Sequence, residues 1–172
     1  MLFWPPVEKK SSKDEHRRRF EYYREHFPQF DPLSQRLFLA FIRASITLKL
    51  SLDRRMRSYG ITSPAYGVLS LLETVPGRCL PMNDISRRTW VTAANVTGVV
   101  DTLQKKGFVL RRPHPRDRRV ILVGLTPRGR QRLARILPRQ FNFIRGLFAI
   151  FNERERNELL GFLERFREEA GK

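Results

Sequence analysis

The sequence has few cysteines and histidines, and this restricts how the fold can be held together. Its single cysteine, Cys79, cannot form a disulfide within the chain or a cysteine-rich zinc site. The three histidines are scattered without metal-ligand spacing, so we expect no metal site and no cofactor. Buried apolar side chains, with a partner subunit if there is one, must therefore supply the stability.

Long apolar runs are also missing. No run approaches the roughly 18 to 20 residues that a membrane-spanning helix needs. The opening segment has only Leu2 to Trp4 before two prolines, whereas the core of a secretory signal needs about 7 to 15 apolar residues. We therefore expect a cytoplasmic protein without a membrane partner.

Acidic residues are few relative to basic ones. The 172 residues include 34 Lys and Arg against 17 Asp and Glu, which gives a formal net charge of +17. A field of this strength attracts polyanions, either nucleic acid or an anionic membrane. Nucleic acid is the better candidate because the chain has no apolar run long enough to span a bilayer.

The motifs of enzymes are absent from the sequence as well. The chain has no glycine-framed loop with paired carboxylates, no glycine-rich turn that cradles phosphates, no nucleophile elbow and no metal cluster. We therefore expect no catalytic activity.

What the chain does have is a series of helical patterns. Apolar residues recur at helical spacing, and Ser, Thr, Asn, Pro and Gly mark the ends of the segments. The predicted helices cover Lys13–His26, Ser34–Tyr59, Ser63–Val75, Met82–Arg88 and Thr92–Lys106, followed by one that starts at Pro127 and one after Asn152. The predicted fold class is mainly α.

Two β-branched runs interrupt the helices after residue 107. Phe108–Arg112 and Val120–Leu125 flank a basic loop, which predicts a β-hairpin. The hairpin carries five arginines and one acid: Arg111, Arg112, Arg116, Arg118, Arg119 and Asp117. A solvated turn that touches nothing is the plain interpretation. Arginine also suits a narrow groove of negative potential, because its guanidinium is flat and weakly hydrated.

The helix predicted just before this hairpin has one buried stripe, with Thr92 placed as its N-cap. The stripe has residues at i, i+3, i+4 and i+7: Val96, Val99, Val100 and Leu103. The order of helix, tight turn, amphipathic helix and basic hairpin predicts a winged helix-turn-helix. In such a module the helix enters the major groove of duplex DNA, and the hairpin reaches the backbone or minor groove beside it.

Three stretches carry a resemblance to a known family. Val100–Gly107, the triplet Asp117–Arg119 and Leu122–Gly129, with its Leu-Thr-x-x-Gly ending, are similar to the MarR family of bacterial and archaeal regulators. The resemblance covers Ser34–Phe166. It implies a triangular homodimer with interlocked terminal helices and two winged modules that face a pseudo-palindromic duplex. It also implies that Asp117 orients the hairpin tip and that Arg119 enters the minor groove.

These patterns divide the chain into four predicted segments. The segments are an N-terminal extension with an extra helix (1–33), a dimerisation helix (34–60), the winged helix-turn-helix (61–126) and C-terminal dimerisation helices (127–172).

The predicted DNA contacts come from the outer face of the helix and from the hairpin. They are Thr92, Ala94, Asn95, Thr97 and Gly98, with Arg112, Arg116, Asp117, Arg118 and Arg119. Asn95 and Thr97 can hydrogen-bond base edges, and Ala94 can meet a thymine methyl group. Gly98 stands where relatives often carry arginine. Either it packs closely against a neighbouring element, or it lies against the groove.

The resemblance further implies a small aromatic or phenolic effector in a crevice between the dimer region and the winged module. The candidate lining residues are Phe38, Phe41, Arg43 and Tyr66. Aromatic residues at helical spacing are more often plain core, so both interpretations stay open.

The functional hypothesis is a sequence-specific transcription regulator, a repressor, that binds double-stranded DNA. The alternative is a non-specific nucleic-acid-binding or DNA-packaging protein, for which the charge of +17 and the small residues of the helix argue. The two differ in observable behaviour, because a non-specific binder has a steep salt dependence and little preference among sequences.

Overall fold

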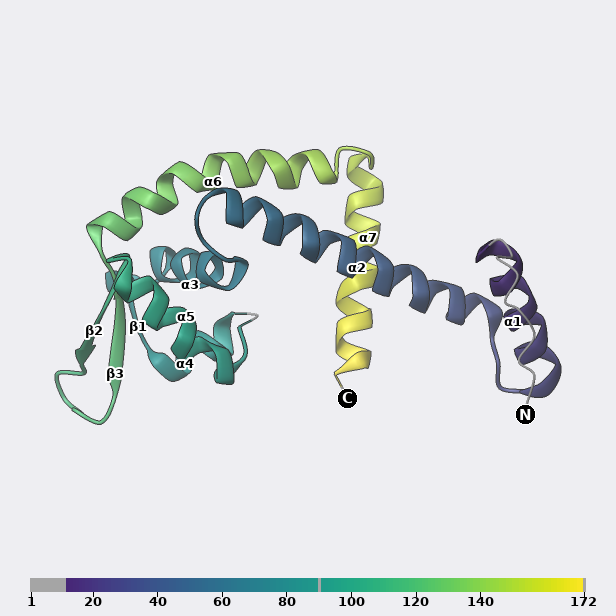
Figure 1. Cartoon of the computed structure of the whole chain (residues 1–172), viewed down its shortest axis with the longest axis horizontal. Coiled ribbons are helices and arrows are strands. Elements are labelled where there is room, and N and C mark those ends of the chain that lie inside the picture. The colour runs from purple at the N-terminus through teal and green to yellow at the C-terminus, as the bar shows by residue number, and fades with distance from the viewer. Residues whose placement is uncertain (1–11, 90, 172) are drawn as a thin grey trace, which may run out of the picture. The chain divides into compact units, whose positions relative to one another are not determined.

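The computed structural model describes residues 12–89 and 91–171. It divides the chain into two compact units, with the boundary between Arg54 and Arg55 inside one helix. The elements, drawn in Figure 1, are α1 (Ser12–His26), α2 (Pro32–Ser58), α3 (Ser63–Thr74), the 3-10 turn η1 (Pro76–Arg78), β1 (Cys79–Pro81), α4 (Met82–Arg88), α5 (Ala93–Lys105), β2 (Val109–Pro113), β3 (Ile121–Leu125), α6 (Pro127–Leu147) and α7 (Glu153–Ala170). The predicted fold class, mainly α with a small β-hairpin wing, is confirmed. The opening segment considered as a signal core lies outside the described residues.

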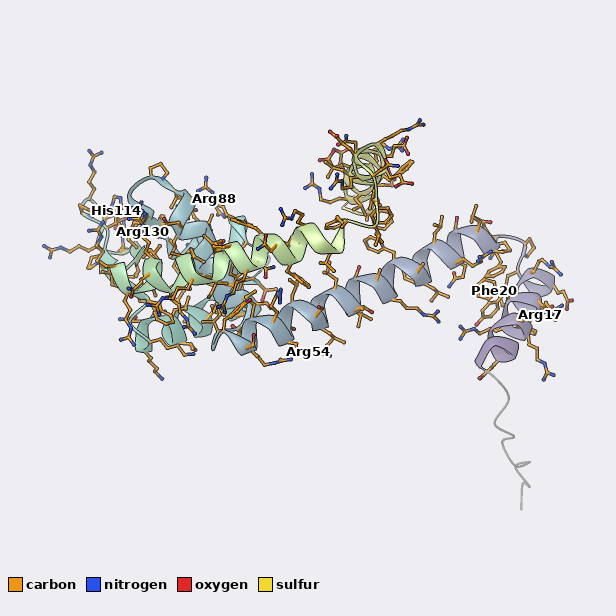
Figure 2. The ribbon with its side chains drawn as sticks, turned by 90° about the horizontal axis from the view of Figure 1, so that it is seen from above. Arg17, Phe20, Arg54, Arg88, His114 and Arg130 are labelled. Atoms are coloured by element: carbon orange, nitrogen blue, oxygen red, sulfur yellow. The ribbon has the colours of Figure 1, made fainter. Side chains whose placement is uncertain are left out.

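The first unit holds α1 and most of α2. Aromatic rings join α1 to the turn that follows it, because the centroids of Phe20 and Phe30 lie 5.5 Å apart and those of Tyr23 and Phe30 also 5.5 Å apart. Figure 2 labels Phe20 on this helix, together with the exposed Arg17. The first pair is edge-to-face and the second tilted, and aromatic pairs of this kind add to the stability from burial, so α1 packs on its own turn.

The α2 helix begins at a carboxylate cap. Asp31 accepts hydrogen bonds from the backbone N–H of Ser34 at 2.9 Å and of Leu33 at 3.2 Å. Hydrogen bonds from Ser34, and then from Leu33, favour the ionised form and lower the pKa of the Asp31 carboxyl. The helix starts at Pro32, two residues before the predicted Ser34, because proline suits the first helical position.

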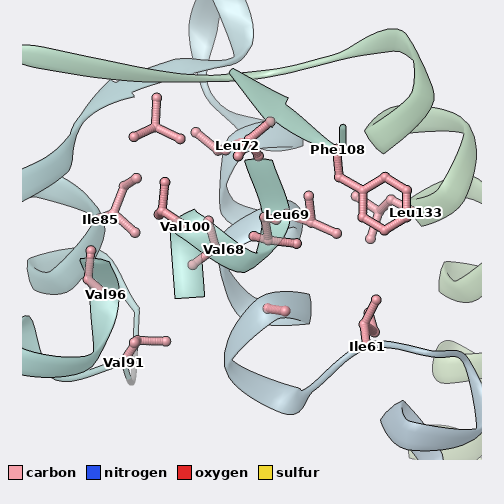
Figure 3. Close-up of a cluster of buried hydrophobic side chains, with 14 of the residues drawn as sticks. Ile61, Val68, Leu69, Leu72, Ile85, Val91, Val96, Val100, Phe108 and Leu133 are labelled. Atoms are coloured by element: carbon pink, nitrogen blue, oxygen red, sulfur yellow. The ribbon is translucent and has the colours of Figure 1, made fainter. Parts of the chain in front are cut away.

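The second unit has one apolar core, shown in Figure 3. The α3 helix contributes Val68, Leu69 and Leu72, which are fully buried. Further buried members come from the end of α2, from α4, α5 and α6, from the turn before β2 and from β3: Met56, Ile85, Val96, Val100, Leu103, Phe108, Val123, Leu133 and Ile136. These elements therefore share one core, which fixes how α5 and the hairpin stand to each other.

The sheet has three strands, one more than the sequence predicted. Its order is β1-β3-β2 and both pairings are antiparallel. The additional strand is β1, in which Cys79 pairs with Gly124 and Pro81 with Leu122. Three residues are too few to show alternation, so only the pairing with β3 makes this segment a strand.

Side-chain caps start two helices of the second unit. Thr62 accepts from the N–H of Ala65 at 3.2 Å at the start of α3. Asn152 and Glu155 form a capping box at the start of α7, with hydrogen bonds of 3.0 and 2.8 Å. Among the described residues, no helix is both long enough and apolar enough to cross a bilayer.

Candidate nucleic-acid interface

The α5 helix is anchored by one face and open on the other. Val96, Val100 and Leu103 are at most 2 % exposed and pack into the core. This stripe is the one predicted from the spacing of the valines. It leaves the side of α5 away from the core exposed to solvent.

The predicted contact residues of α5 lie on that open side. Ala94, Asn95, Thr97 and Gly98 are all exposed. Thr92 stands at the N-cap position as predicted, but its hydroxyl makes no capping hydrogen bond. The N-terminal half of α5 therefore presents small and hydrogen-bonding groups to solvent.

Gly98 does not pack closely against a neighbouring element. A Cβ atom built at Gly98 would meet nothing within 4 Å, so the close-packing interpretation is wrong. Its carbonyl accepts a hydrogen bond of 2.9 Å from the Thr102 hydroxyl. Because Gly98 has no side chain, the backbone of α5 is uncovered at this position.

The hairpin of β2 and β3, with its loop 114–120, is called the wing below. It extends away from the helices of the second unit to a free loop (Figure 1). Asp117 organises that loop, because its Oδ1 atom accepts from the backbone N–H of Arg119 at 3.0 Å and pairs with the Arg119 Nε at 3.3 Å. The Arg119 side chain is nevertheless 92 % exposed.

The remaining basic residues of the wing divide into two groups. Arg112, Arg116 and Arg118 are exposed, as the prediction requires. Figure 2 shows long nitrogen-ended side chains that extend outward around His114 in this region. Arg111 instead faces α5, where its guanidinium contacts the Asp101 carboxylate and donates to Gln104 Oε1 at 3.1 Å.

A cleft of about 530 Å³ lies between the start of α4, α5 and the wing. It brings together three of the predicted contact residues, Thr97, Arg112 and Arg119, from two separate elements. Asn83 also lines it and is not among the predicted contact residues. No sequence signal marks Asn83, because only the packing of α4 beside β3 brings it there.

The predicted effector residues fall in different units. Phe38, Phe41 and Arg43 lie on α2 in the first unit, whereas Tyr66 lies on α3 in the second and packs against its core. The effector pocket therefore stays a prediction. Within residues 12–89 and 91–171, no group of three or more His, Cys, Asp or Glu side chains could hold a metal ion.

The order of these elements defines a winged helix-turn-helix protein: a tight turn, then a helix with an open polar face, then an arginine-tipped hairpin. A model of the MarR family matches residues 59–120, which run from the end of α2 to the tip of the wing. Over this segment the chain is similar to the MarR family of winged-helix transcriptional regulators.

Curated relatives and solved structures agree with this assignment. The transcriptional repressor YetL of Bacillus subtilis is 28 % identical over 86 % of this chain and 90 % of its own length. The repressor MprA of Escherichia coli is 26 % identical over 62 % of this chain and 61 % of its own. The Streptomyces coelicolor regulator Sco3205, solved in complex with DNA, is 27 % identical with a TM-score of 0.76, over 82 % of this chain and 89 % of that one. Sco5413, a MarR family regulator of the same organism, is 28 % identical with a TM-score of 0.70, over 82 % and 97 %.

Proposed function

We propose that this chain represses transcription by binding a pseudo-palindromic DNA operator as a homodimer. One observation carries the proposal: the open face of α5 and the arginine-tipped wing border the same cleft. A helix placed beside a cationic hairpin in this way can enter a major groove while the hairpin follows the adjacent backbone.

The open face of α5 supplies base contacts of modest number. Asn95 and Thr97 have groups that can bond base edges, and Ala94 has a methyl group that fits beside thymine. Thr92 has a hydroxyl that is not used as a cap, and it can donate to a phosphate. The absence of a side chain at Gly98 lets the backbone of α5 approach the groove closely.

The wing supplies contacts of a second kind. Arg119, held by Asp117, is the side chain proposed to enter the minor groove, whose negative potential attracts guanidinium groups. Arg112, Arg116 and Arg118 are proposed to contact phosphates, which position the protein without reading the sequence.

The homodimer is proposed from apolar side chains that the single chain leaves exposed. Helices α2, α6 and α7 each expose several, among them Leu37, Phe38, Ile46, Phe141, Ile144, Leu160, Phe162 and Phe166. Apolar surface of this extent marks an interface. Two-fold symmetry would then space the half-sites about one helical turn, on the order of 10 bp, apart.

Three further parts of the proposal follow from the regulator role. A small aromatic or phenolic effector is proposed to act at Phe38, Phe41, Arg43 and Tyr66 by changing the spacing of the two winged modules. The protein is proposed to act in the cytoplasm, where it can reach a bacterial or archaeal chromosome. It is also proposed to have no catalytic activity.

Selection of bound duplexes from a random DNA pool tests the proposal. We expect enrichment of a palindrome whose half-sites are separated by about one helical turn. A matched selection with Arg116, Arg118 and Arg119 changed to Gln is expected to enrich the same sequence less. Recovery of unselected sequences by the parent protein would show a non-specific nucleic-acid binder instead.

A further inference from the structure

Four arginines form a row along α6. The helix has six arginines and no acidic residue. Arg128, Arg132, Arg135 and Arg139 follow one another at intervals of four, three and four residues, so they lie along one side of an α-helix. The buried residues Gly129, Leu133, Ile136 and Gln140 occupy the neighbouring side. We call this row of four side chains the arginine ridge.

The inner part of the ridge is fixed by contacts with neighbouring elements. The Arg132 guanidinium donates to the Tyr59 carbonyl oxygen just after α2. The Arg128 guanidinium lies 5.8 Å from the centre of the Phe108 ring. Lys106 adds a cation beside the same turn, because its Nζ donates to the Gly60 carbonyl at 2.6 Å. Arg132 and Lys106 therefore bring two cations to the C-terminal end of α2, where the helix dipole favours positive charge.

The outer part of the ridge is open. Arg135 and Arg139 are exposed, and neither has a hydrogen bond or an ion pair with any other described residue. Together with Tyr59 and Arg132 they line a second cleft, of about 480 Å³. By contrast Arg130, on another side of α6 and labelled in Figure 2, is paired with Glu73 at 3.2 Å. Positive charge on the ridge is therefore not balanced by carboxylates in the described part of the chain.

The ridge is separate from the proposed operator interface. Val109 pairs with Leu125 at the base of the wing, and α6 starts two residues later at Pro127 (Figure 1). The tip of the wing lies at the other end of the strands, roughly 14 Å away for four steps along a strand. A duplex held by the wing tip and the first half of α5 therefore leaves the ridge accessible.

We propose that the arginine ridge binds the phosphate backbone of a second segment of duplex DNA, so that one operator-bound protein holds two duplexes together. The ridge runs over eleven residue steps from Arg128 to Arg139, about 16 Å of helix, and so matches roughly five phosphates of one strand. Its exposed neighbours are Gln131, Ala134, Pro138 and Asn142, which offer no large apolar centre. Protein interfaces usually have such a centre, whereas binding to a phosphate backbone does not need one.

The proposal rests on the proposed operator binding, so the test measures the two activities separately. Beads carry either the selected operator duplex or a shuffled duplex, and retained protein reports operator binding. A fluorescent duplex of unrelated sequence is then added, and the captured fluorescence reports the second site.

The ridge variant is Arg128→Gln, Arg135→Gln and Arg139→Gln; Arg132 is kept because it holds the Tyr59 carbonyl. The control variant is Arg154→Gln, Arg156→Gln and Arg167→Gln on α7, which removes the same charge from other exposed positions.

We expect the ridge variant to be retained on operator beads like the parent protein. It should capture about tenfold less second duplex, and the log–log salt slope of capture should fall by about 2.7 for three lost phosphate contacts. The control variant should capture as much as the parent. Equal capture by the ridge variant, equal losses in both variants, or no capture by the parent would each overturn the proposal. Equal retention of the parent on operator and shuffled beads would instead contradict the proposed function.

Discussion

Arg111 on β2 and Asp101 on α5 form an ion pair that joins the wing to the helix beside it. The same guanidinium donates to Gln104 Oε1 at 3.1 Å and lies 3.4 Å from the Thr97 carbonyl oxygen. Its side chain is only 25 % exposed, whereas that of Arg119 is 92 % exposed. Two arginines of one hairpin therefore have different uses: one holds the wing in place, and the other, paired only with Asp117 beside it in the loop, stays exposed to solvent.

Removal of the Asp101 carboxylate is expected to weaken operator binding without changing the preferred sequence. In Asp101→Ala the wing loses its tie to α5, and we expect a loss of about 1 kcal/mol in binding, the typical value of one hydrogen bond. Asp84→Ala is the control, because Asp84 pairs with Arg87 at 3.9 Å and that arginine is 79 % exposed. A double-mutant cycle with Arg111→Ala, measured by gel shift, checks the pairing. Simple additivity of the two substitutions would contradict it.

Arg119→Ala is expected to weaken operator binding by about 1 to 3 kcal/mol, in line with the loss of a groove contact. Thermal unfolding should be unchanged, because the side chain is almost fully exposed. The control is Arg154→Ala on α7, which is 86 % exposed and pairs with Glu158 at 2.8 Å in a similar way. A gel-shift titration in which the Arg119 variant matches the parent protein would refute the wing assignment.

Gly98→Ala is expected to stabilise the fold and to weaken DNA binding. The added Cβ meets nothing within 4 Å, and alanine is better than glycine inside a helix by about 1 kcal/mol. On the DNA the same methyl group would stand between α5 and the groove. Gly161→Ala on α7 is the matched control, since its Cβ is equally unobstructed. Urea unfolding should show both gains, and only Gly98→Ala should bind DNA more weakly. Unaltered DNA affinity of that variant would show that α5 does not approach the groove at this position.

Gly129→Ala is expected to destabilise the second unit by about 3 kcal/mol, because an added Cβ would overlap the Phe108 carbonyl oxygen. The carbonyl has little freedom to move, since Thr126 donates to it at 3.1 Å and to the Gly107 carbonyl at 2.7 Å. Urea unfolding of this variant beside Gly161→Ala separates the clash from the general effect of alanine. Equal stability of the two variants would mean that α6 can shift away from β2.

Much of the second unit was predictable because its signals are local. The valine spacing of α5 and the two β-branched runs each act over a few residues, and the structure has them. Thr92 also stands at the predicted N-cap position, although its hydroxyl makes no capping hydrogen bond. Strand β1 was not predictable, because its three residues become a strand only by pairing with β3. The role of Arg111 was hidden for the same reason. In the sequence it is one of five arginines, and only the approach of β2 to α5 distinguishes it.

The sequence by itself determined the class of the protein. An excess of basic residues, a helix with one apolar stripe and an arginine-rich hairpin are properties of neighbouring residues along the chain, so they can be recognised without coordinates. The tertiary structure alone decided which groups stay available. It turns Arg111 inward and leaves Arg119 outward, and it shows that Gly98 faces open space. It also places Arg135 and Arg139 on a surface without carboxylates. The physical reason is that burial and ion pairing depend on contacts between residues far apart in the chain.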